Sequence, residues 1–281
     1  MKACVLGSGV MGTGIVSVLI GSDEIENLYW YGRNSATLDK SLEAVRKSTL
    51  RSLKKQGRDA TECESLLNKI KIVTEINEIE ASDIYIEAVV EELDAKLALF
   101  KELNKVIPKD ALVASNTSSL SITALAMCIE NPNNFIGIHF FNPTSVMKLV
   151  EVVVGLTTAD STLERALEFV NGLGKEPVIV NESPGFIVNR MLIPMINEAV
   201  SIFAEGIASK EDIDKAMKYG ANHPIGPLQL ADLIGNDVCL SIMETLHTET
   251  GDPKYRAHPL LRQYVRANYL GRKSGKGFYE Y

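Results

Sequence analysis

Six residues near the start of the chain constrain its fold more than any others, because they read Gly7-Ser8-Gly9-Val10-Met11-Gly12. They follow the apolar run Ala3–Leu6 and open an apolar helical pattern. In such a strand–turn–helix, the first glycine permits the turn, the second admits a pyrophosphate, and the third lets helix and strand pack closely. The helix N-terminus offers free N–H groups to phosphate oxygens. The motif predicts a dinucleotide site contacted by Gly7, Gly9, Val10, Met11 and Gly12, and the alternative is a merely structural turn.

Short apolar runs alternate with helical patterns through the first 180 residues, as is typical of a largely parallel sheet covered by helices. From Arg190 onward, apolar residues recur at helical spacing instead. The pair Pro184-Gly185 favours a turn between these two parts. We therefore predict an α/β fold: a Rossmann-type dinucleotide-binding domain (residues 1–183), then an all-helical domain for substrate binding and dimerisation (residues 184–281). The expected strands are Ala3–Leu6, Leu28–Tyr31, Ile84–Ala88, Leu112–Ser115, Phe135–His139, Leu149–Val154 and Val178–Val180.

Composition excludes several classes of protein. With 281 residues and 46% hydrophobic content the chain can bury a sizeable core, and its net charge of −7 argues against a nucleic-acid binder. No apolar run reaches the length of a membrane span, and the start does not resemble a signal peptide, so we expect a cytoplasmic protein. The four cysteines are widely spaced and lack histidines at ligand spacing, which favours free thiols and no metal site.

The residues after the second expected strand bear on the choice of cofactor. An Asp or Glu there accepts hydrogen bonds from the adenosine ribose in NAD sites, but this chain has Gly32-Arg33-Asn34-Ser35. Gly32 leaves room for a 2′-phosphate, and the cation of Arg33 can pair with it, helped by the polar side chain of Asn34. We expect NADP(H) to be preferred, with NAD(H) possible. The alternative is that Arg33 is solvated, or stacks on adenine without discriminating.

Polar residues stand where three strands of the predicted sheet should end: Ser115–Ser119, His139–Pro143 and Glu151. Ligands of open α/β sheets bind beyond the carboxyl ends of strands. Interconversion of an alcohol and a ketone needs a proton donor that titrates near neutrality, which favours His139, with Glu151 as the carboxylate that orients it. Alternatively, His139 is a core residue, Glu151 faces water, and Ser118 or Ser119 caps a helix that starts near Leu120.

The sequence also resembles the 3-hydroxyacyl-CoA dehydrogenase family from end to end, and most closely its short, stand-alone bacterial members. The resemblance rests on successive motifs in the family's order, and Ala221–Pro227 followed by Ala231-Asp232 fits the same pattern. The principal motifs are Gly7–Gly12, Glu87–Glu92, Ser115–Leu120, Gly137–Pro143, Met147–Val152, Ser183–Arg190 and Gly271–Tyr279. The sequence differs from the family's pattern at Gly32-Arg33, where most relatives carry an acidic residue. The use of NAD therefore does not follow from the resemblance.

This resemblance implies specific roles. His139 would be the acid/base and Glu151 its partner, with Ser118 and Asn189 around the 3-oxygen and thioester of the substrate and Asn142 supporting the site. The cofactor cleft would be lined by Glu91, Lys96, Asn116 and Lys273, besides Ser118 and Asn142. The implied substrate is an acyl-CoA such as acetoacetyl-CoA.

A CoA substrate carries phosphates, and the helical stretch after the second strand is rich in cations. Lys47, Arg51 and Lys54, with Arg46 and Lys55 beside them, could form a phosphate clamp, although such spacing is also ordinary for a solvated helix face. Met191–Phe203 is apolar around much of its circumference, which favours a homodimer or higher homo-oligomer over a purely internal core. Two other functions stay open: dehydrogenation of a free 3-hydroxy acid, and non-catalytic nucleotide binding.

Overall fold

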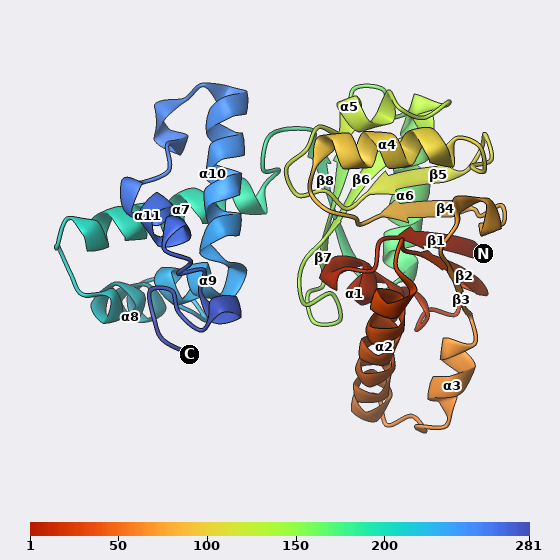
Figure 1. Cartoon of the computed structure of the whole chain (residues 1–281), viewed down its shortest axis with the longest axis horizontal. Coiled ribbons are helices and arrows are strands. Elements are labelled where there is room, and N and C mark those ends of the chain that lie inside the picture. The colour runs from red at the N-terminus through yellow and green to blue at the C-terminus, as the bar shows by residue number, and fades with distance from the viewer. The chain divides into compact units, whose positions relative to one another are not determined.

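The structure, a computed structural model, describes all 281 residues. The chain divides into two compact units, Met1–Ser183 and Pro184–Tyr281 (Figure 1). The first contains the whole β-sheet and the second is built from helices. The observed architecture confirms the predicted α/β fold with a Rossmann-type N-terminal part and a helical C-terminal part.

The sheet of the first unit has eight strands in the order β3-β2-β1-β4-β5-β6-β7-β8. Every neighbouring pair is parallel except β6 and β7, which are antiparallel. All seven expected strands are confirmed, and β3 was missed because it is a short, half-exposed edge strand without a continuous apolar run. The strands are β1 (Lys2–Leu6), β2 (Asn27–Tyr31), β3 (Ile70–Val73), β4 (Ile84–Glu87), β5 (Leu112–Ser115), β6 (Phe135–Phe140), β7 (Leu149–Val154) and β8 (Glu176–Asn181).

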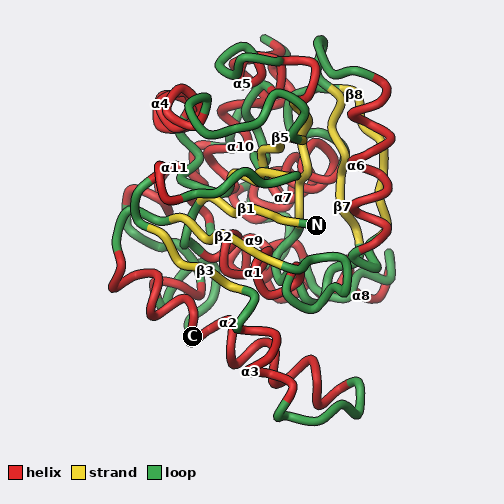
Figure 2. Tube along the Cα trace, turned by 90° about the vertical axis from the view of Figure 1, so that its right-hand side faces the viewer, coloured by secondary structure: helices red, strands yellow, loops and turns green.

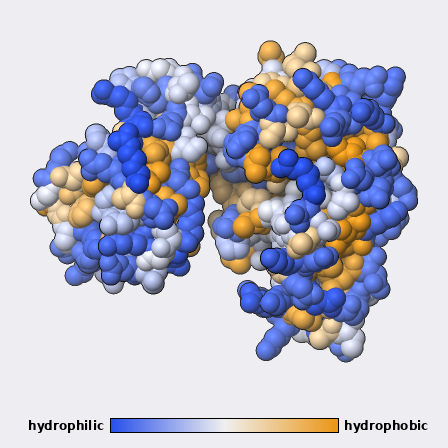
Figure 3. Space-filling model, in the orientation of Figure 1, coloured by the Kyte–Doolittle hydropathy of each residue, from blue (hydrophilic) through white to orange (hydrophobic).

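Six helices belong to the first unit: α1 (Val10–Leu19), α2 (Ser35–Lys55), α3 (Glu62–Leu67), α4 (Leu93–Leu103), α5 (Ile122–Ala126) and α6 (Asp160–Gly172). The central strands read as nearly continuous apolar runs because helices bury both faces of the sheet. In two perpendicular views α2 and α3 extend past the edge of the sheet (Figures 1 and 2). Most of this extension is hydrophilic (Figure 3), as expected for a helix that buries only one stripe.

The second unit contains α7 (Val188–Ala204), α8 (Lys210–Gly220), α9 (Pro227–Ile234), α10 (Asn236–Thr250) and α11 (Pro259–Arg266). These helices share one apolar core. The C-terminal segment is held by the buried Asp232 carboxylate, which accepts hydrogen bonds from the backbone N–H groups of Phe278 (2.9 Å) and Tyr279 (2.8 Å). No helix of the chain combines the length and the apolarity that crossing a membrane requires.

Candidate active site

The glycine turn between β1 and α1 has the backbone that its sequence predicts. Gly7 lies at φ +124°, where a side chain would be strained, and a Cβ there would collide with the carbonyl oxygen of Ala88. A Cβ on Gly12 would likewise strike the carbonyl oxygen of Gly7. Gly9 is different, because no atom of the protein lies within 4 Å of the position of its Cβ. The turn therefore packs tightly on the protein side and stays open at Gly9, which fits the approach of a pyrophosphate.

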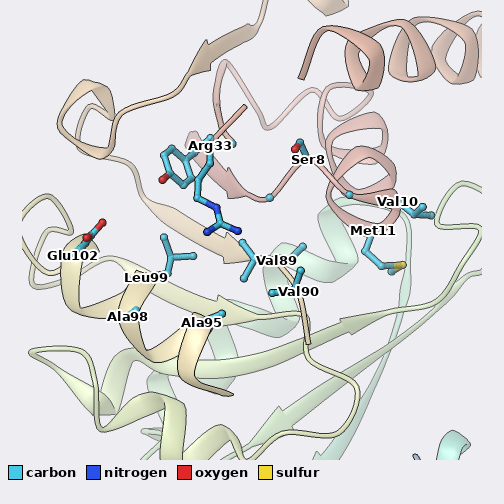
Figure 4. A pocket seen from close by; sticks show the side chains of 15 residues that line it. Ser8, Val10, Met11, Arg33, Val89, Val90, Ala95, Ala98, Leu99 and Glu102 are labelled. Atoms are coloured by element: carbon cyan, nitrogen blue, oxygen red, sulfur yellow. The ribbon is translucent and has the colours of Figure 1, made fainter. Parts of the chain in front are cut away.

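A cavity of about 550 Å³ opens over this turn (Figure 4). This volume lies within the range of small-molecule and cofactor sites. The side chain of Arg33 points into the cavity, and the apolar side chains of the segment after β4 and of α4 form its opposite wall (Figure 4). The cavity is lined by Gly7, Ser8, Gly9, Val10, Met11, Tyr31, Gly32, Arg33, Ala88, Val89, Val90, Ala95, Ala98, Leu99 and Glu102.

The segment after β2 combines a residue that faces the cavity with residues that support the fold. Gly32 is tightly surrounded, since its Cβ would lie 3.1 Å from both Leu38 Cγ and Ser8 Oγ. The missing side chain therefore serves this packing, and the expectation that it leaves room for a 2′-phosphate is wrong. Asn34 is the N-cap of α2, where its Oδ1 accepts a hydrogen bond from the Thr37 N–H (3.0 Å), and it is not among the residues that line the cavity. Arg33 is thus the residue of this segment that offers a positive charge to a ligand.

His139 and Glu151 face each other across the antiparallel pair β6 and β7. The Nδ1 atom of His139 lies 2.8 Å from Oε2 of Glu151. The two residues are 6% and 1% exposed, so a carboxylate facing water is excluded. A buried carboxylate beside Nδ1 stabilises a positive charge on the ring and fixes the orientation of the ring. The pair has the geometry of an oriented general acid/base.

The loop after β5 carries Ser118 and is held by Glu91. The Glu91 Oε1 atom accepts hydrogen bonds from Thr117 Oγ1 (2.5 Å) and from the Ser118 N–H (2.7 Å), and Ser118 Oγ lies 3.3 Å away. The nearby helix α5 starts at Ile122 with Ser121 as its N-cap, because Ser121 Oγ accepts from the Ala124 N–H. Capping therefore explains neither Ser118 nor Ser119.

Asn116, in the same loop, connects two strand ends. Its Oδ1 accepts a hydrogen bond from the backbone N–H of Phe140 (2.8 Å), next to His139. The side chain is 8% exposed. Asn116 therefore ties the end of β5 to the end of β6.

Comparisons with known proteins agree along the whole chain. The profile of the 3-hydroxyacyl-CoA dehydrogenase NAD binding domain matches residues 2–183, and that of the C-terminal domain of the same family matches residues 185–281. The chain belongs to the 3-hydroxyacyl-CoA dehydrogenase family. Its N-terminal part is accordingly an NAD-binding domain.

Individual members of this dehydrogenase family are similar over their full length. The chain is 48% identical to a 3-hydroxybutyryl-CoA dehydrogenase of Clostridioides difficile, with 100% of this chain and 99% of the relative covered. It is 38% identical to the human mitochondrial hydroxyacyl-coenzyme A dehydrogenase, with 99% and 90% covered. The crystal structure of (S)-3-hydroxybutyryl-CoA dehydrogenase from Ralstonia eutropha superposes with a TM-score of 0.93 at 44% identity, covering 100% of this chain and 98% of that chain.

The residues that line the cavity include none of those that the resemblance places in the cofactor cleft, namely Glu91, Lys96, Asn116, Ser118, Asn142 and Lys273. Of these, Lys96 is buried. It is 1% exposed, and its Nζ lies 2.6 Å from Glu87 Oε1 and 3.1 Å from Glu91 Oε2. Glu87 is 0% exposed and also accepts a hydrogen bond from Ser115 Oγ (2.5 Å). Lys96 thus joins two carboxylates and does not line the cavity. Glu87 begins one of the family motifs, but no role was predicted for it, although a carboxylate that ends an apolar strand was an available signal.

Burial and nearby charge shift the pKa values of Glu87 and Glu91 in opposite directions. Burial raises the pKa of Glu87, and the Lys96 ammonium offsets this only in part. Burial alone would also raise the pKa of Glu91, but the Lys96 charge and the hydrogen bonds from Thr117 and Ser118 outweigh it and hold that pKa below its ordinary value. Glu91 therefore stays ionised as the acceptor of the Ser118 loop.

Three other residues that the resemblance places at the site are Asn142, Asn189 and Lys273. Asn142 is exposed on the loop that follows β6. Asn189 lies in the first turn of α7, and Lys273 lies in a short 3₁₀ turn where its Nζ is 2.6 Å from Asp237 Oδ2. Both belong to the helical unit.

The cations of α2 differ in their availability. Arg46 is bound by Glu64 and lies 3.6 Å from Glu43. Lys47, Arg51 and Lys54 are exposed along the same helix, without an ion pair to a carboxylate. These three remain free to meet an anionic ligand. Glu102, on the wall of the cavity, was not anticipated because nothing in its local pattern distinguishes it from a surface carboxylate.

Proposed function

We propose that this protein is an (S)-3-hydroxybutyryl-CoA dehydrogenase that favours NADP(H). It would reversibly interconvert acetoacetyl-CoA and (S)-3-hydroxybutyryl-CoA. The observation that carries the proposal is the buried His139–Glu151 pair, an acid/base suited to a carbonyl oxygen. The substrate class is supported by relatives named 3-hydroxybutyryl-CoA dehydrogenase, which are 44% to 48% identical over the full length of this chain.

The chemistry follows from the side chains. The nicotinamide supplies a hydride to C3 of the 3-ketoacyl thioester when bound. Protonated His139 gives its proton from Nε2 to the oxygen that gains charge, and Glu151 stabilises the imidazolium before the transfer. Hydroxyl and amide donors on Ser118 and Asn189 would hydrogen-bond the same oxygen or the thioester, and a well-placed donor of this kind contributes about 2.7–4 kcal/mol. Asn142 would support this arrangement. In the reverse direction His139 accepts the hydroxyl proton.

The dinucleotide would bind across the glycine turn, with Gly9 and the N-terminus of α1 meeting the pyrophosphate. Preference for NADP(H) is supported by Arg33 pointing into the cavity and by the absence of a carboxylate in Gly32-Arg33-Asn34. One or two charged hydrogen bonds to a 2′-phosphate, at about 1.5–3 kcal/mol each, correspond to roughly 10-fold to 100-fold or more in preference. Glu91, Asn116 and Lys273 would adjoin the cofactor, with Lys96 acting through Glu91.

The CoA phosphates would be met by Lys47, Arg51 and Lys54, which are exposed on one helix and free of carboxylate partners. The helical unit would complete the substrate site and form a homodimer or a higher homo-oligomer. Its exposed apolar side chains, such as Met191 (72%) and Ile207 (67%), support an interface. We place the protein in the cytoplasm, where its four free cysteines would stay reduced.

One assay tests this function. Purified protein is mixed with acetoacetyl-CoA and either NADPH or NADH, and the loss of reduced cofactor is followed by absorbance. We expect turnover with both cofactors and a higher kcat/KM with NADPH. Turnover of acetoacetate without CoA would instead support a dehydrogenase of free 3-hydroxy acids. Cofactor binding without turnover of either substrate would support a non-catalytic nucleotide-binding protein.

A further inference from the structure

The loop between β6 and β7 packs directly on α1, the helix that opens the dinucleotide turn. Thr144 of this loop is 5% exposed. It fills the space that a side chain would occupy at Gly14, because a Cβ on Gly14 would collide with Thr144 Oγ1 and lie 3.0 Å from Thr144 Cγ2. Only a glycine at position 14 lets the loop approach the helix this closely.

A lysine holds the same loop through its backbone. Lys175, just before β8, donates hydrogen bonds from Nζ to the carbonyl oxygens of Thr144 (2.5 Å) and Met147 (2.9 Å). The Glu176 N–H donates to the carbonyl oxygen of Lys148 (2.9 Å). Burial lowers the pKa of Lys175, as expected for an ammonium whose hydration is replaced by backbone carbonyls.

We propose that Gly14, Thr144 and Lys175 are positioning residues that set the distance between the cofactor helix α1 and the strands that carry His139 and Glu151. This inference rests on the proposed dehydrogenase function. Hydride and proton must reach one carbonyl group, the first from the dinucleotide bound at α1 and the second from β6. A misplacement of about 1 Å between reacting groups can cost on the order of 100-fold in rate. The Gly14–Thr144 contact joins the two supports of these groups.

A double-variant experiment tests this role, in which a second substitution should restore what the first one removes. Gly14→Ala should lower kcat by about 10-fold or more, because the added methyl group pushes the loop away from α1. The cofactor Kd of this variant should change much less. It is measured through the fluorescence of Trp30, whose indole N–H donates a hydrogen bond to the carbonyl oxygen of Gly7 in the glycine turn. Thr144→Ala removes both atoms that the methyl group would strike. The double variant should therefore return to the kcat of Thr144→Ala alone. Gly21→Ala is the matched control, because its Cβ would make an ordinary contact of 3.4 Å with the Val18 carbonyl oxygen.

Hydrogen exchange of residues 141–148 gives a second readout that needs no substrate. Exchange should be faster in Gly14→Ala and in Lys175→Met, and it should return to the Thr144→Ala level in the double variant. If the wild-type protein did not turn over acetoacetyl-CoA, the proposed function would be refuted. The hydrogen-exchange data would still test the contact between Gly14 and Thr144. Unchanged kcat and exchange in Gly14→Ala would overturn the inference. A double variant that recovers neither activity nor folding would also overturn it, since Thr144 would then not be the limiting neighbour.

Discussion

The indole Nε1 of Trp30 donates a hydrogen bond to the carbonyl oxygen of Gly7 at 2.8 Å, so the single tryptophan of the chain touches the dinucleotide turn itself. Trp30 is fully buried near the end of β2 and belongs to the hydrophobic core. Its emission overlaps the absorption of a reduced nicotinamide. The protein therefore contains its own reporter for cofactor binding.

We expect NADPH to quench Trp30 emission and to gain sensitised emission of its own. Gly9→Ala should weaken this binding, since its methyl group would enter open space that the pyrophosphate needs, while meeting no protein atom within 4 Å. The Tm of Gly9→Ala should stay within a few degrees of the wild-type value, as measured by circular dichroism. Unaltered NADPH titration in Gly9→Ala would show that the dinucleotide does not cross the turn at this residue.

Removal of the acid/base should stop turnover without unfolding the protein. We expect His139→Ala to lower kcat by about 100-fold to 10,000-fold. Glu151→Gln can still accept a hydrogen bond from the imidazole but cannot stabilise its positive charge, so it should lower kcat much more than it raises the KM for acetoacetyl-CoA. Steady-state kinetics with matched circular dichroism spectra measure both effects. An effect of Glu151→Gln on KM alone would contradict the role given to this carboxylate.

Arg33 should account for much of the cofactor preference. Arg33→Gln should reduce the ratio of kcat/KM for NADPH to that for NADH by roughly 10-fold to 100-fold, because an uncharged amide replaces a cation at the 2′-phosphate. The comparison variant is Arg266→Gln, which changes an exposed arginine at the end of α11. Equal losses with both cofactors would mean that Arg33 binds a part of the dinucleotide that they share.

The buried ion pair of Lys96 should be strongly coupled to Glu87. Lys96→Met leaves Glu87 buried without its cation and should lower the free energy of unfolding by about 3–5 kcal/mol. Adding Glu87→Gln should recover part of this loss. Lys101→Met, on the exposed face of the same helix α4, should change stability by less than about 0.5 kcal/mol. Urea unfolding is measured for the wild type, the two single variants Lys96→Met and Glu87→Gln, their double variant and Lys101→Met. Strictly additive losses for Lys96→Met and Glu87→Gln would rule out the coupling.

The stability of the protein at low pH should depend on Glu80, whose carboxylate binds side chains from three adjacent strands of the sheet. Hydrogen bonds from Tyr29 on β2, Lys71 on β3 and Lys2 on β1 lower its pKa from 4.5 to about 2. A carboxyl with a lowered folded-state pKa stabilises the protein above its ordinary titration range and loses that contribution as the pH falls. The stability difference between wild type and Glu80→Gln should therefore be constant near neutrality and shrink between pH 4.5 and about 2. High salt should also reduce it, since these groups are exposed.

Local patterns were sufficient to predict most of the fold. The glycine turn, seven of the eight strands and the change to a helical second part all follow from residue periodicity and turn chemistry, which act over a few neighbouring residues. The edge strand β3 was missed because Ile70–Val73 contains a lysine and is half-exposed, so its strand character depends on pairing with β2. The start of α5 was also misplaced, since three serines before it could each have capped a helix.

The sequence by itself determined which chemical groups the chain carries and in what order its elements follow, because turns, caps and hydrophobic periods are properties of adjacent residues. Only the tertiary structure decided that β7 runs antiparallel to β6, which sets the buried Glu151 carboxylate against His139. It also decided that Lys96 is sealed between two carboxylates, and that Thr144 rests on Gly14. These contacts join residues from different elements, so they depend on strand direction and on the packing of elements that are distant along the chain.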